Sequence, residues 1–398
     1  MRIYHPSRLL PALLLLSACS GEQQAPARGG ANHDQQAASA QVANDAGSTT
    51  SDSIVIDLRN PSGVDGIIAE LRDKRLVAVG ETHTSYAHHL AQLEIIRRLH
   101  AQQPDIAIGM EMFQAPFQSV LDAYVAGEIS EQQLLQQSGW FDRWGYDYRL
   151  YRPILEYARE QRIPVVALNI STELKERVSE VGVDGLSAQE RQQIPGEIDR
   201  SDRDYEQRLR QIYEQHQQLD TDGFERFVEV QLLWDESMAS RAAAWLRDHP
   251  RTTMVLLAGS GHLLHGSGIP SRVSRRIPVD SVIVLPGDGL EIAPGVADFV
   301  IFPAAAQLPA AGLMGLYLDK AETGVRVGGV GGDSSAAAAG VKQDDIIVRL
   351  NGMQVGSVSD IKVALLDKAP GERVTLEISR KGLLWGGERH EFTFELGE

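Results

Sequence analysis

Five short apolar segments, each followed by a small or turn-forming residue, constrain the fold of this chain more than any other feature of its sequence. Segments of this length that are rich in Val, Ile and Leu are typical of strands buried on both faces of a sheet. Helical patterns over residues 87–102 and 151–161 lie between some of them. Strands that alternate with helices predict an α/β domain with a mostly parallel sheet and flanking helices. The five segments are residues 75–79, 105–108, 164–168, 253–257 and 281–285.

A polar stretch interrupts this alternation in the middle of the chain. Residues 182–224 carry no strand pattern, and the charged residues 204–218 have helical spacing. A longer helical pattern follows over residues 225–247. We therefore expect a small helical insertion over the sheet edge, within a first folded domain that spans residues 53–300.

The start of the chain has the pattern of a secretory signal. Two arginines, Arg2 and Arg8, precede the apolar residues 9–16, which are too few to span a bilayer because a span needs about 20. The ending Leu-Ser-Ala-Cys at residues 16–19 resembles the bacterial lipobox. We expect residues 1–19 to be a lipoprotein signal peptide that exports the chain to the periplasm, with a lipid on Cys19 as the membrane anchor. An ordinary signal peptide with an incidental cysteine is the alternative.

Composition narrows the class of protein further. Cys19 is the only cysteine, so disulfides and thiolate metal sites are excluded. In the lipoproteins that this start resembles, Asp after the cysteine retains the protein in the inner membrane, so Ser20 favours the outer membrane. Residues 20–52 are poor in large apolar side chains and predict a flexible tether. The net charge of −16 argues against a nucleic-acid partner.

Acidic and imidazole side chains follow three of the predicted strands where each strand ends. Glu81 and His83 come after the first strand, Glu111 after the second and His262 after the fourth. Because the carboxyl ends of parallel strands meet at one edge of a sheet, these four should converge. They could form a hydrolase site, in which one group acts as a general base or several hold a divalent metal ion. Solvated loop residues are the alternative, and neither a His-Glu-x-x-His nor a Gly-x-Ser-x-Gly motif is present.

The last part of the chain has a different pattern. A Leu-Met-Gly-Leu-Tyr-Leu opening at residues 313–318 precedes an Ala-Gly-Val-Lys segment at 339–342 and an Asn-Gly pair at 351–352. A helix is predicted over residues 359–366 with Ser359 as its N-cap, and an alternating strand over 373–380. This order resembles a PDZ domain, a β-rich α+β module, over residues 312–398.

The PDZ resemblance implies that a C-terminal peptide of another protein adds as a strand beside Leu316 and Leu318. Backbone amides in the opening turn would hold its carboxylate, and the following helix would line the side-chain pocket. A degenerate module that only packs on the first domain is the alternative. The residues expected to bind peptide are Met314, Gly315, Leu316, Leu318, Val363 and Leu366.

Several motifs over residues 55–290 occur together in the order of one family. They resemble those of the ChaN-like haem-binding lipoproteins, whose wider superfamily is similar to the erythromycin esterases and the Tiki-type metalloproteases. The resemblance implies an α/β domain with a smaller helical part and a homodimer that holds two stacked haems. The motifs are Gly80-Glu81-Thr82-His83, Gly109-Met110-Glu111-Met112-Phe113, Tyr151-Arg152-Pro153, Val166-Ala167-Leu168-Asn169, Gln231 with Trp234-Asp235 and Met238-Ala239, and Ala258-Gly259 with Gly261-His262.

The same resemblance implies one tyrosine ligand for each haem iron, with a histidine and a lysine of the facing subunit on the propionates. Tyr148 and Tyr151 are the candidate ligands, since aromatic residues gather here, although an ordinary aromatic core has the same pattern. For the propionates the candidates are His88 or His216 as the imidazole and Lys175 as the ammonium. A plain helix-surface charge is the alternative for Lys175, and an exposed residue at a helix start is the alternative for His88.

A tyrosinate oxygen suits ferric iron, and haem held in this way is usually exchangeable. The sequence therefore predicts a haem-binding envelope lipoprotein of haem and iron uptake, more a carrier than an enzyme. A hydrolase that uses the four strand-end residues, with or without a divalent metal, is one alternative. A membrane-tethered adaptor that works through its PDZ module is the other.

Overall fold

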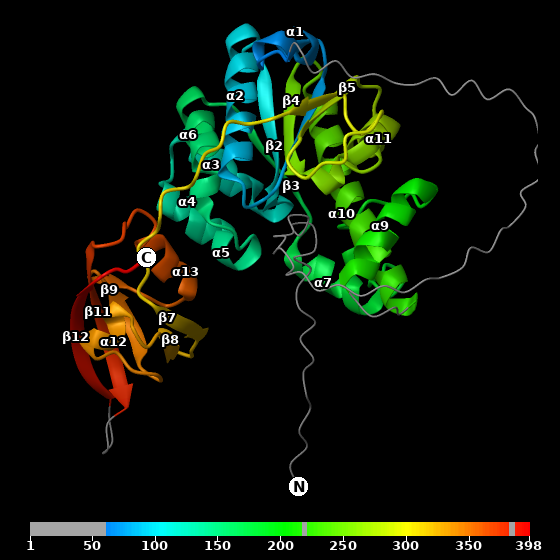
Figure 1. Cartoon of the computed structure of the whole chain (residues 1–398). Helices are drawn as coiled ribbons and strands as arrows, with labels where there is room; N and C mark the ends of the chain where they lie inside the picture. Colours follow the sequence, from blue (N-terminus) through cyan, green and yellow to red (C-terminus); the bar gives the residue numbers. More distant parts are fainter. Residues whose placement is uncertain (1–60, 217–220, 382–386) are drawn as a thin grey trace, which may run out of the picture.

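A computed structural model describes residues 61–216, 221–381 and 387–398 (Figure 1). The predicted signal peptide, the lipid site Cys19 and the tether lie outside these residues. Within the described part, no helix is both long enough and apolar enough to cross a bilayer.

The first domain is built on a six-stranded sheet in which every strand pair is parallel. The predicted α/β architecture is therefore confirmed, and the five predicted strands are present. The three-residue β6 was missed because so short a segment carries no periodic pattern. In sheet order the strands are β3 (Val165–Asn169), β2 (Ile106–Gln114), β4 (Thr253–Gly259), β1 (Leu76–Glu81), β5 (Ser281–Pro286) and β6 (Phe299–Ile301).

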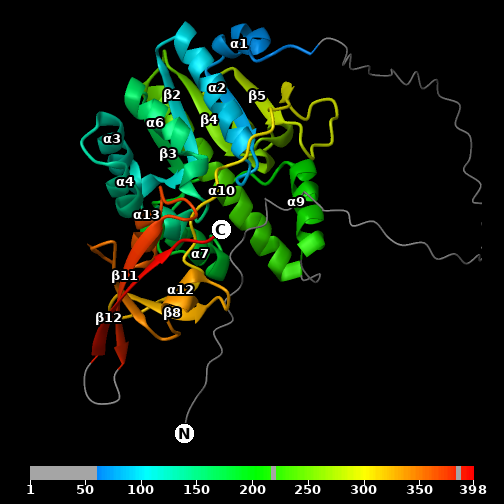
Figure 2. The ribbon, with the colours of Figure 1, turned by 60° about the vertical axis from the view of Figure 1, so that its left-hand side comes forward.

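Helices cover both faces of this sheet (Figures 1 and 2). Alternate residues of β1 show the two layers, since Val77 and Val79 pack with α2 while Leu76 and Ala78 pack with α10. On the first face lie α1 (Asp65–Arg72), α2 (Tyr86–Gln102), α3 (Gln118–Ala126), α4 (Glu131–Ser138) and α6 (Arg152–Gln161). On the second face lie α7 (Thr172–Val181), α10 (Thr221–Asp248) and α11 (Ile269–Arg276).

The predicted helical insertion has a small core of its own. It contains α8 (Ala188–Arg191) and α9 (Arg203–His216), and it leads into the 28-residue helix α10. Tyr205, Leu209 and Tyr213 of α9 pack against aromatic residues at the start of α10, including Phe224 and Phe227. This contact holds α9 beside α10 at the edge of the domain (Figure 1).

The second domain is an antiparallel β-rich module with two short helices, α12 (Ser335–Ala339) and α13 (Val358–Ala364). The N-cap of α13 is Ser357, which forms a capping box with Asp360. The prediction of Ser359 as the N-cap was wrong, because the capping box with Asp360 is formed by Ser357, two residues earlier. In sheet order the strands are β12 (Gly387–Glu395), β11 (Arg373–Lys381), β9 (Ile346–Leu350), β8 (Val325–Val330) and β7 (Leu316–Lys320), with β10 (Met353–Gln354) beside β9.

The two domains meet where α13 packs on α4 and the short helix α5 (Trp140–Arg143), as Figure 1 shows. Ser359 donates a 2.8 Å hydrogen bond to Asp142 of α5. Val363 and Leu366 were expected to line the peptide pocket, but the structure places them against the core of the first domain. Their placement follows from the rotation of α13, which the local sequence does not determine.

Candidate functional site

Three neighbouring strands bring the four predicted side chains together. In the sheet order β2–β4–β1, Glu81 ends β1 beside Gly259 of β4, and Glu111 lies near the end of β2. His262 follows β4 in the 3₁₀ turn Ser260–His262. The glycine allows a close approach, because a Cβ on Gly259 would lie 3.0 Å from the His83 ring. The convergence expected of a parallel sheet is therefore present in the structure.

Glu81 is the acceptor at the centre of the first half of this cluster. Its carboxylate is bound by the imidazoles of His83 and His89, and the Tyr151 hydroxyl donates a 3.0 Å hydrogen bond to it. Burial favours the neutral acid, but the two imidazoles outweigh that effect and lower the pKa of Glu81. The charged carboxylate is thus held in place by three donors.

The second half of the cluster is a chain of alternating carboxylates and imidazole. His262 lies 2.6 Å from Asp235 through Nδ1 and 3.5 Å from Glu111 through Nε2. Glu111 also accepts a 2.7 Å hydrogen bond from the Gly259 amide. Burial opposes the charged imidazole, but the two carboxylates outweigh it and raise the pKa of His262 to about 10. Tyr205 of the helical insertion completes the chain by donating to Asp235.

These pKa shifts decide what the cluster can do chemically. Burial disfavours the charged form of His83, but its bond to Glu81 outweighs this and raises the pKa of His83 as well. With a pKa of about 10, His262 is protonated near neutral pH and cannot accept a proton from water, so it is not suited to be a general base. The raised pKa of His83 favours its protonated form as well. The arrangement is better suited to holding fixed positive charge beside a ligand.

A metal ion is not supported by the geometry of the donors. Among residues 61–216, 221–381 and 387–398, no group of three or more His, Cys, Asp or Glu side chains could hold a metal ion. The physical reason is that the carboxylates of Glu81 and Glu111 are already engaged with imidazoles. The divalent-metal alternative therefore receives no support from the donor set.

Aromatic rings mark the side on which the cluster approaches the surface. His83 is 8% exposed, whereas Glu81, Glu111 and His262 are 1–2% exposed. The His83 ring contacts the half-buried Trp144 and Tyr146, with ring centres 4.8 and 5.1 Å away. His83 and its two aromatic neighbours are thus the part of the cluster that a ligand reaches first.

The two predicted haem-ligand tyrosines lie beneath this surface. Tyr148 and Tyr151 are both fully buried, and Trp140 packs edge-on against each ring. Burial, aided in Tyr151 by the nearby Glu81, raises the pKa of each tyrosine well above its usual range. A tyrosinate ligand needs the opposite shift, so iron binding by either residue stays a prediction.

The three predicted propionate residues have different surroundings. Lys175 is half-buried, with its ammonium 4.6 Å from the Trp234 ring centre, and burial lowers the pKa of Lys175. His88 is 4% exposed and lies 3.2 Å from Asp288, while its other ring nitrogen accepts from the Thr82 amide. His216 ends α9, and its side chain falls outside the described part.

Sequence reasoning missed His89, Asp235 and Tyr205. His89 is 1% exposed and pairs with Glu81. On α2, His89 lies three residues before Gln92 and seven before Ile96, so the three share one face of the helix. Because that face is buried, this spacing is the signal that would have predicted a buried His89. Asp235 directly follows the apolar run Leu232-Leu233-Trp234 of α10, and such a neighbourhood is a signal for a buried carboxylate with a partner.

The strand beside which a peptide was predicted to bind lies at an edge of the second domain's sheet. Among the described strands, β7 pairs only with β8 and ends the sheet, which leaves its other side open. Leu316 and Leu318 are half-buried against the domain core, while Tyr317 is 73% exposed. Gly315 adopts a φ of 71° and a Cβ there would lie 2.3 Å from Ser334, so the turn beside Met314 requires glycine.

Comparison with known families agrees with this architecture. The model of the family described as haem-binding uptake, Tiki superfamily, ChaN matches residues 67–273, which is just over half of the chain. The protein therefore belongs to this family. A PDZ domain model matches residues 312–393, so a PDZ domain follows the family domain.

Individual relatives match only parts of the chain. The serine protease Do-like HtrB of Bacillus subtilis is 41% identical over 70 residues, 17% of this chain and 15% of the relative. A DegP-like periplasmic serine endoprotease of Chlamydia muridarum is 30% identical over 130 residues, 33% of this chain and 24% of the relative. The matched parts thus span less than a quarter of these relatives.

Among solved structures, a cofacial haem complex of ChaN from Campylobacter jejuni is similar to 59% of this chain and 90% of its own, with a TM-score of 0.49 and 21% identity.

Proposed function

We propose that this protein binds haem at the surface formed by His83, Trp144 and Tyr146 and takes part in haem uptake at the cell envelope. Membership of the ChaN family supports the ligand. The observation that carries the proposal is a group of three rings in mutual contact at the carboxyl edge of the sheet, in which the half-buried Trp144 and Tyr146 pack against the imidazole of His83 and against each other. Ligand sites of α/β proteins lie at this edge.

The residues at this surface fit a haem. Trp144 and Tyr146 offer apolar ring faces against which a porphyrin can pack. Tyr146 also brings a phenol oxygen, a hard donor that suits ferric iron once it is deprotonated, and it is less buried than Tyr148 or Tyr151. Lys175 has a partly desolvated ammonium that would pair with a propionate. Haem bound here would be cargo, held by an exchangeable oxygen ligand.

The rest of the chain suits a protein of the envelope. A lipid on Cys19 and the tether over residues 20–52 would hold the two domains near the outer membrane. The PDZ domain would capture the C-terminal peptide of a partner along β7. DegP-like relatives that are periplasmic by name support this location. Two chains with facing haems, as the family resemblance implies, would complete the site.

Hemin titration of the purified full chain tests the proposal. We expect a shift of the Soret band on binding, and Tyr146→Phe should weaken hemin binding at least about tenfold because it removes one strong polar interaction. Tyr157→Phe is the matched control, since Tyr157 is half-buried on α6 and bonds His100 instead. An unchanged hemin spectrum would refute haem binding. A loss caused only by Tyr148→Phe or Tyr151→Phe would return the ligand role to those residues.

A further inference from the structure

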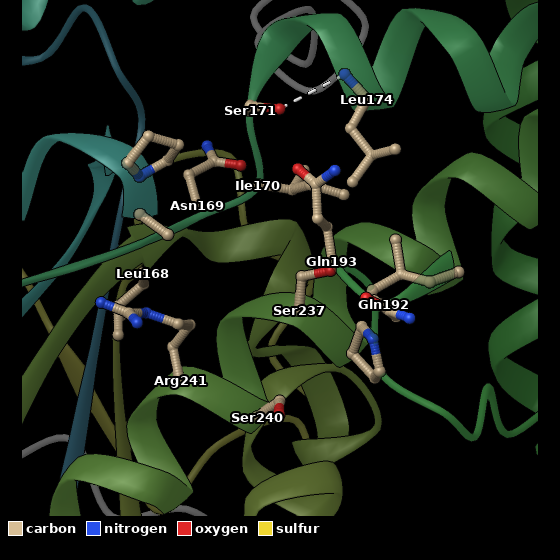
Figure 3. Close-up of a pocket in the computed structure, with 14 residues that line it drawn as sticks. Leu168, Asn169, Ile170, Ser171, Leu174, Gln192, Gln193, Ser237, Ser240 and Arg241 are labelled. Carbon is tan, nitrogen blue, oxygen red and sulfur yellow. Dashed lines mark hydrogen bonds between the residues drawn. The ribbon is translucent and has the colours of Figure 1, made fainter. Parts of the chain in front are cut away.

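A cavity lies beside the end of β3, apart from the surface at His83 (Figure 3). Its volume is about 370 Å³, at the lower end of the range for small-molecule sites. Residues 168–174 form one wall, residues 192–195 of the helical insertion form another, and α10 forms the third. Asn169 lies in the wall that faces the strand-end cluster, because its amide bonds both Trp234 and the Glu111 carbonyl.

Arg241 of α10 brings an incompletely paired positive charge to this cavity. Its Nε donates a 3.2 Å hydrogen bond to the Ala167 carbonyl, while its two terminal nitrogens have no acceptor among the residues described. The carboxylate of Asp122 favours the charged form of Arg241 through its electrostatic field. Asp122 accepts a hydrogen bond from Gln118 and forms no ion pair with Arg241. Burial lowers the pKa of Arg241, as expected of a guanidinium whose charge is poorly compensated.

Ser237 supplies a second polar group on the same side. It stands one helical turn before Arg241, so the two side chains share a face of α10. It is 7% exposed, and its hydroxyl has no hydrogen-bond partner within the described ranges. A buried hydroxyl without a partner is costly, so a ligand that accepts from it would be favoured. Figure 3 shows Ser237 and Arg241 on the α10 side of the cavity.

The opposite side of the cavity combines apolar residues with the polar side chains of Ser171, Gln192 and Gln193. Ile170 and Leu174 face it from the start of α7, and Ile194 and Pro195 close it from the insertion. A ligand with an apolar body and one anionic end would therefore fit the cavity, because the apolar residues would contact its body and Arg241 would pair with its charge. A phosphate or sulfate ion would match the guanidinium but would leave this apolar surface unsatisfied.

We propose that this cavity binds a small organic carboxylate, whose charged end accepts hydrogen bonds from Arg241 and Ser237 while its hydrocarbon part packs on Leu174 and Ile194. The planar guanidinium fork matches the two oxygens of a carboxylate. Since one water occupies about 30 Å³ of liquid volume, the space equals about a dozen waters, which suits a short arylalkyl or alkyl acid. This inference does not depend on haem binding.

Calorimetric titration of the full chain with 4-phenylbutyrate tests the proposal. We expect saturable binding that Arg241→Gln weakens by about tenfold to a hundredfold, the range for losing a hydrogen bond to a charged group. Ser237→Ala should weaken it by a smaller factor. Arg247→Gln is the matched control, because Arg247 lies in the last turn of the same helix and is exposed. The neutral analogue 4-phenyl-1-butanol should bind more weakly than the acid.

Two outcomes would overturn the proposal. One is the absence of 4-phenylbutyrate binding at millimolar concentration, and the other is equal binding by Arg241→Gln and the wild type. Hemin titration of Arg241→Gln separates this site from the proposed haem surface, because hemin affinity should stay unchanged. A loss of hemin binding in this variant would assign the cavity to the haem site. The unfolding temperature of Arg241→Gln should not fall, which excludes misfolding as the cause of a weaker response.

Discussion

At the scale of single residues, the strand-end cluster is a set of buried charges that stabilise one another. Glu81, Glu111 and His262 have almost no contact with solvent. A buried charge without a partner is strongly disfavoured, so each needs an opposite charge within a few ångströms. Glu81 is paired with the imidazoles of His83 and His89. His262 is paired with the carboxylates of Asp235 and Glu111.

The raised pKa of His262 predicts how stability changes with pH. Its ordinary pKa is 6.5 and its folded pKa is about 10, so its stabilising contribution is complete below pH 6.5 and is lost as the pH rises to about 10. The free energy of unfolding should therefore fall across this window. Glu81 and Glu111 have lowered pKa values, so their contributions are lost only in acid, below their ordinary 4.5.

Urea unfolding between about pH 6 and pH 10 measures this effect. Asp235→Asn should show a shallower fall than the wild type, because it removes one of the two carboxylates that raise the pKa of His262. Parallel pH profiles of the two proteins would contradict the assignment.

Gly80 provides a second prediction at this scale. A Cβ at Gly80 would lie 2.6 Å from Leu285 and 2.7 Å from the Ser260 hydroxyl. Gly80→Ala should therefore destabilise the domain by about 1–3 kcal/mol, the usual cost of overpacking. Gly196→Ala is the control, since no atom lies within 4 Å of its added Cβ. Denaturant midpoints measure both, and an equal response in the two variants would contradict this packing argument.

At the scale of elements, the helical insertion is fastened to the site by one aromatic residue. Tyr205 of α9 donates its hydroxyl to the buried Asp235 of α10. The same residue packs in the small core formed by α9 and the start of α10. Because Asp235 in turn holds His262, the insertion contributes to the geometry of the sheet edge.

Tyr205→Phe tests this connection. It removes one donor from a buried carboxylate, so we expect a loss of about 1–3 kcal/mol and faster proteolysis within α9. Tyr317→Phe is the matched control, because the Tyr317 side chain is 73% exposed. Urea unfolding and limited proteolysis give the two measurements. An unaltered α9 in Tyr205→Phe would show that the insertion is held without the Tyr205–Asp235 hydrogen bond.

At the scale of the whole molecule, α5 joins the two domains to the site. A four-residue helix has little stability of its own, so its position depends on its packing. Phe141 and Asp142 of α5 contact α13, while Trp140 of the same helix packs against Tyr151. A movement of α13 would therefore shift α5 and, through Trp140, the packing of Tyr151 beside Glu81.

Arg152 bridges the domains by pairing with Glu131 of α4 and with Asp367 beyond α13. Arg152→Ala should loosen the contact, and hydrogen exchange in α5 and α13 should become faster. Arg373→Ala is the control, because its pair with Glu395 is exposed and lies within the PDZ domain. Unchanged exchange in Arg152→Ala would mean that the remaining contacts, among them the apolar packing of Val363 and the Ser359–Asp142 hydrogen bond, are sufficient for docking.

The sequence alone determined the architecture and the location of the site. Apolar periodicity is a local property, so the five longer strands, the helical insertion and the PDZ order could be predicted within a few residues. The convergence of Glu81, His83, Glu111 and His262 followed from a topological rule, because parallel strands end at one edge.

Only the tertiary structure decided which side chains touch across elements that are distant in sequence. The rotation of α13 turned Val363 and Leu366 towards the first domain, and the packing around Trp140 buried Tyr148 and Tyr151. The pairing of Asp235 with His262 and the cavity at Arg241 also depend on how helices cross the sheet. These contacts are set by the summed packing of the whole core, which no local pattern records.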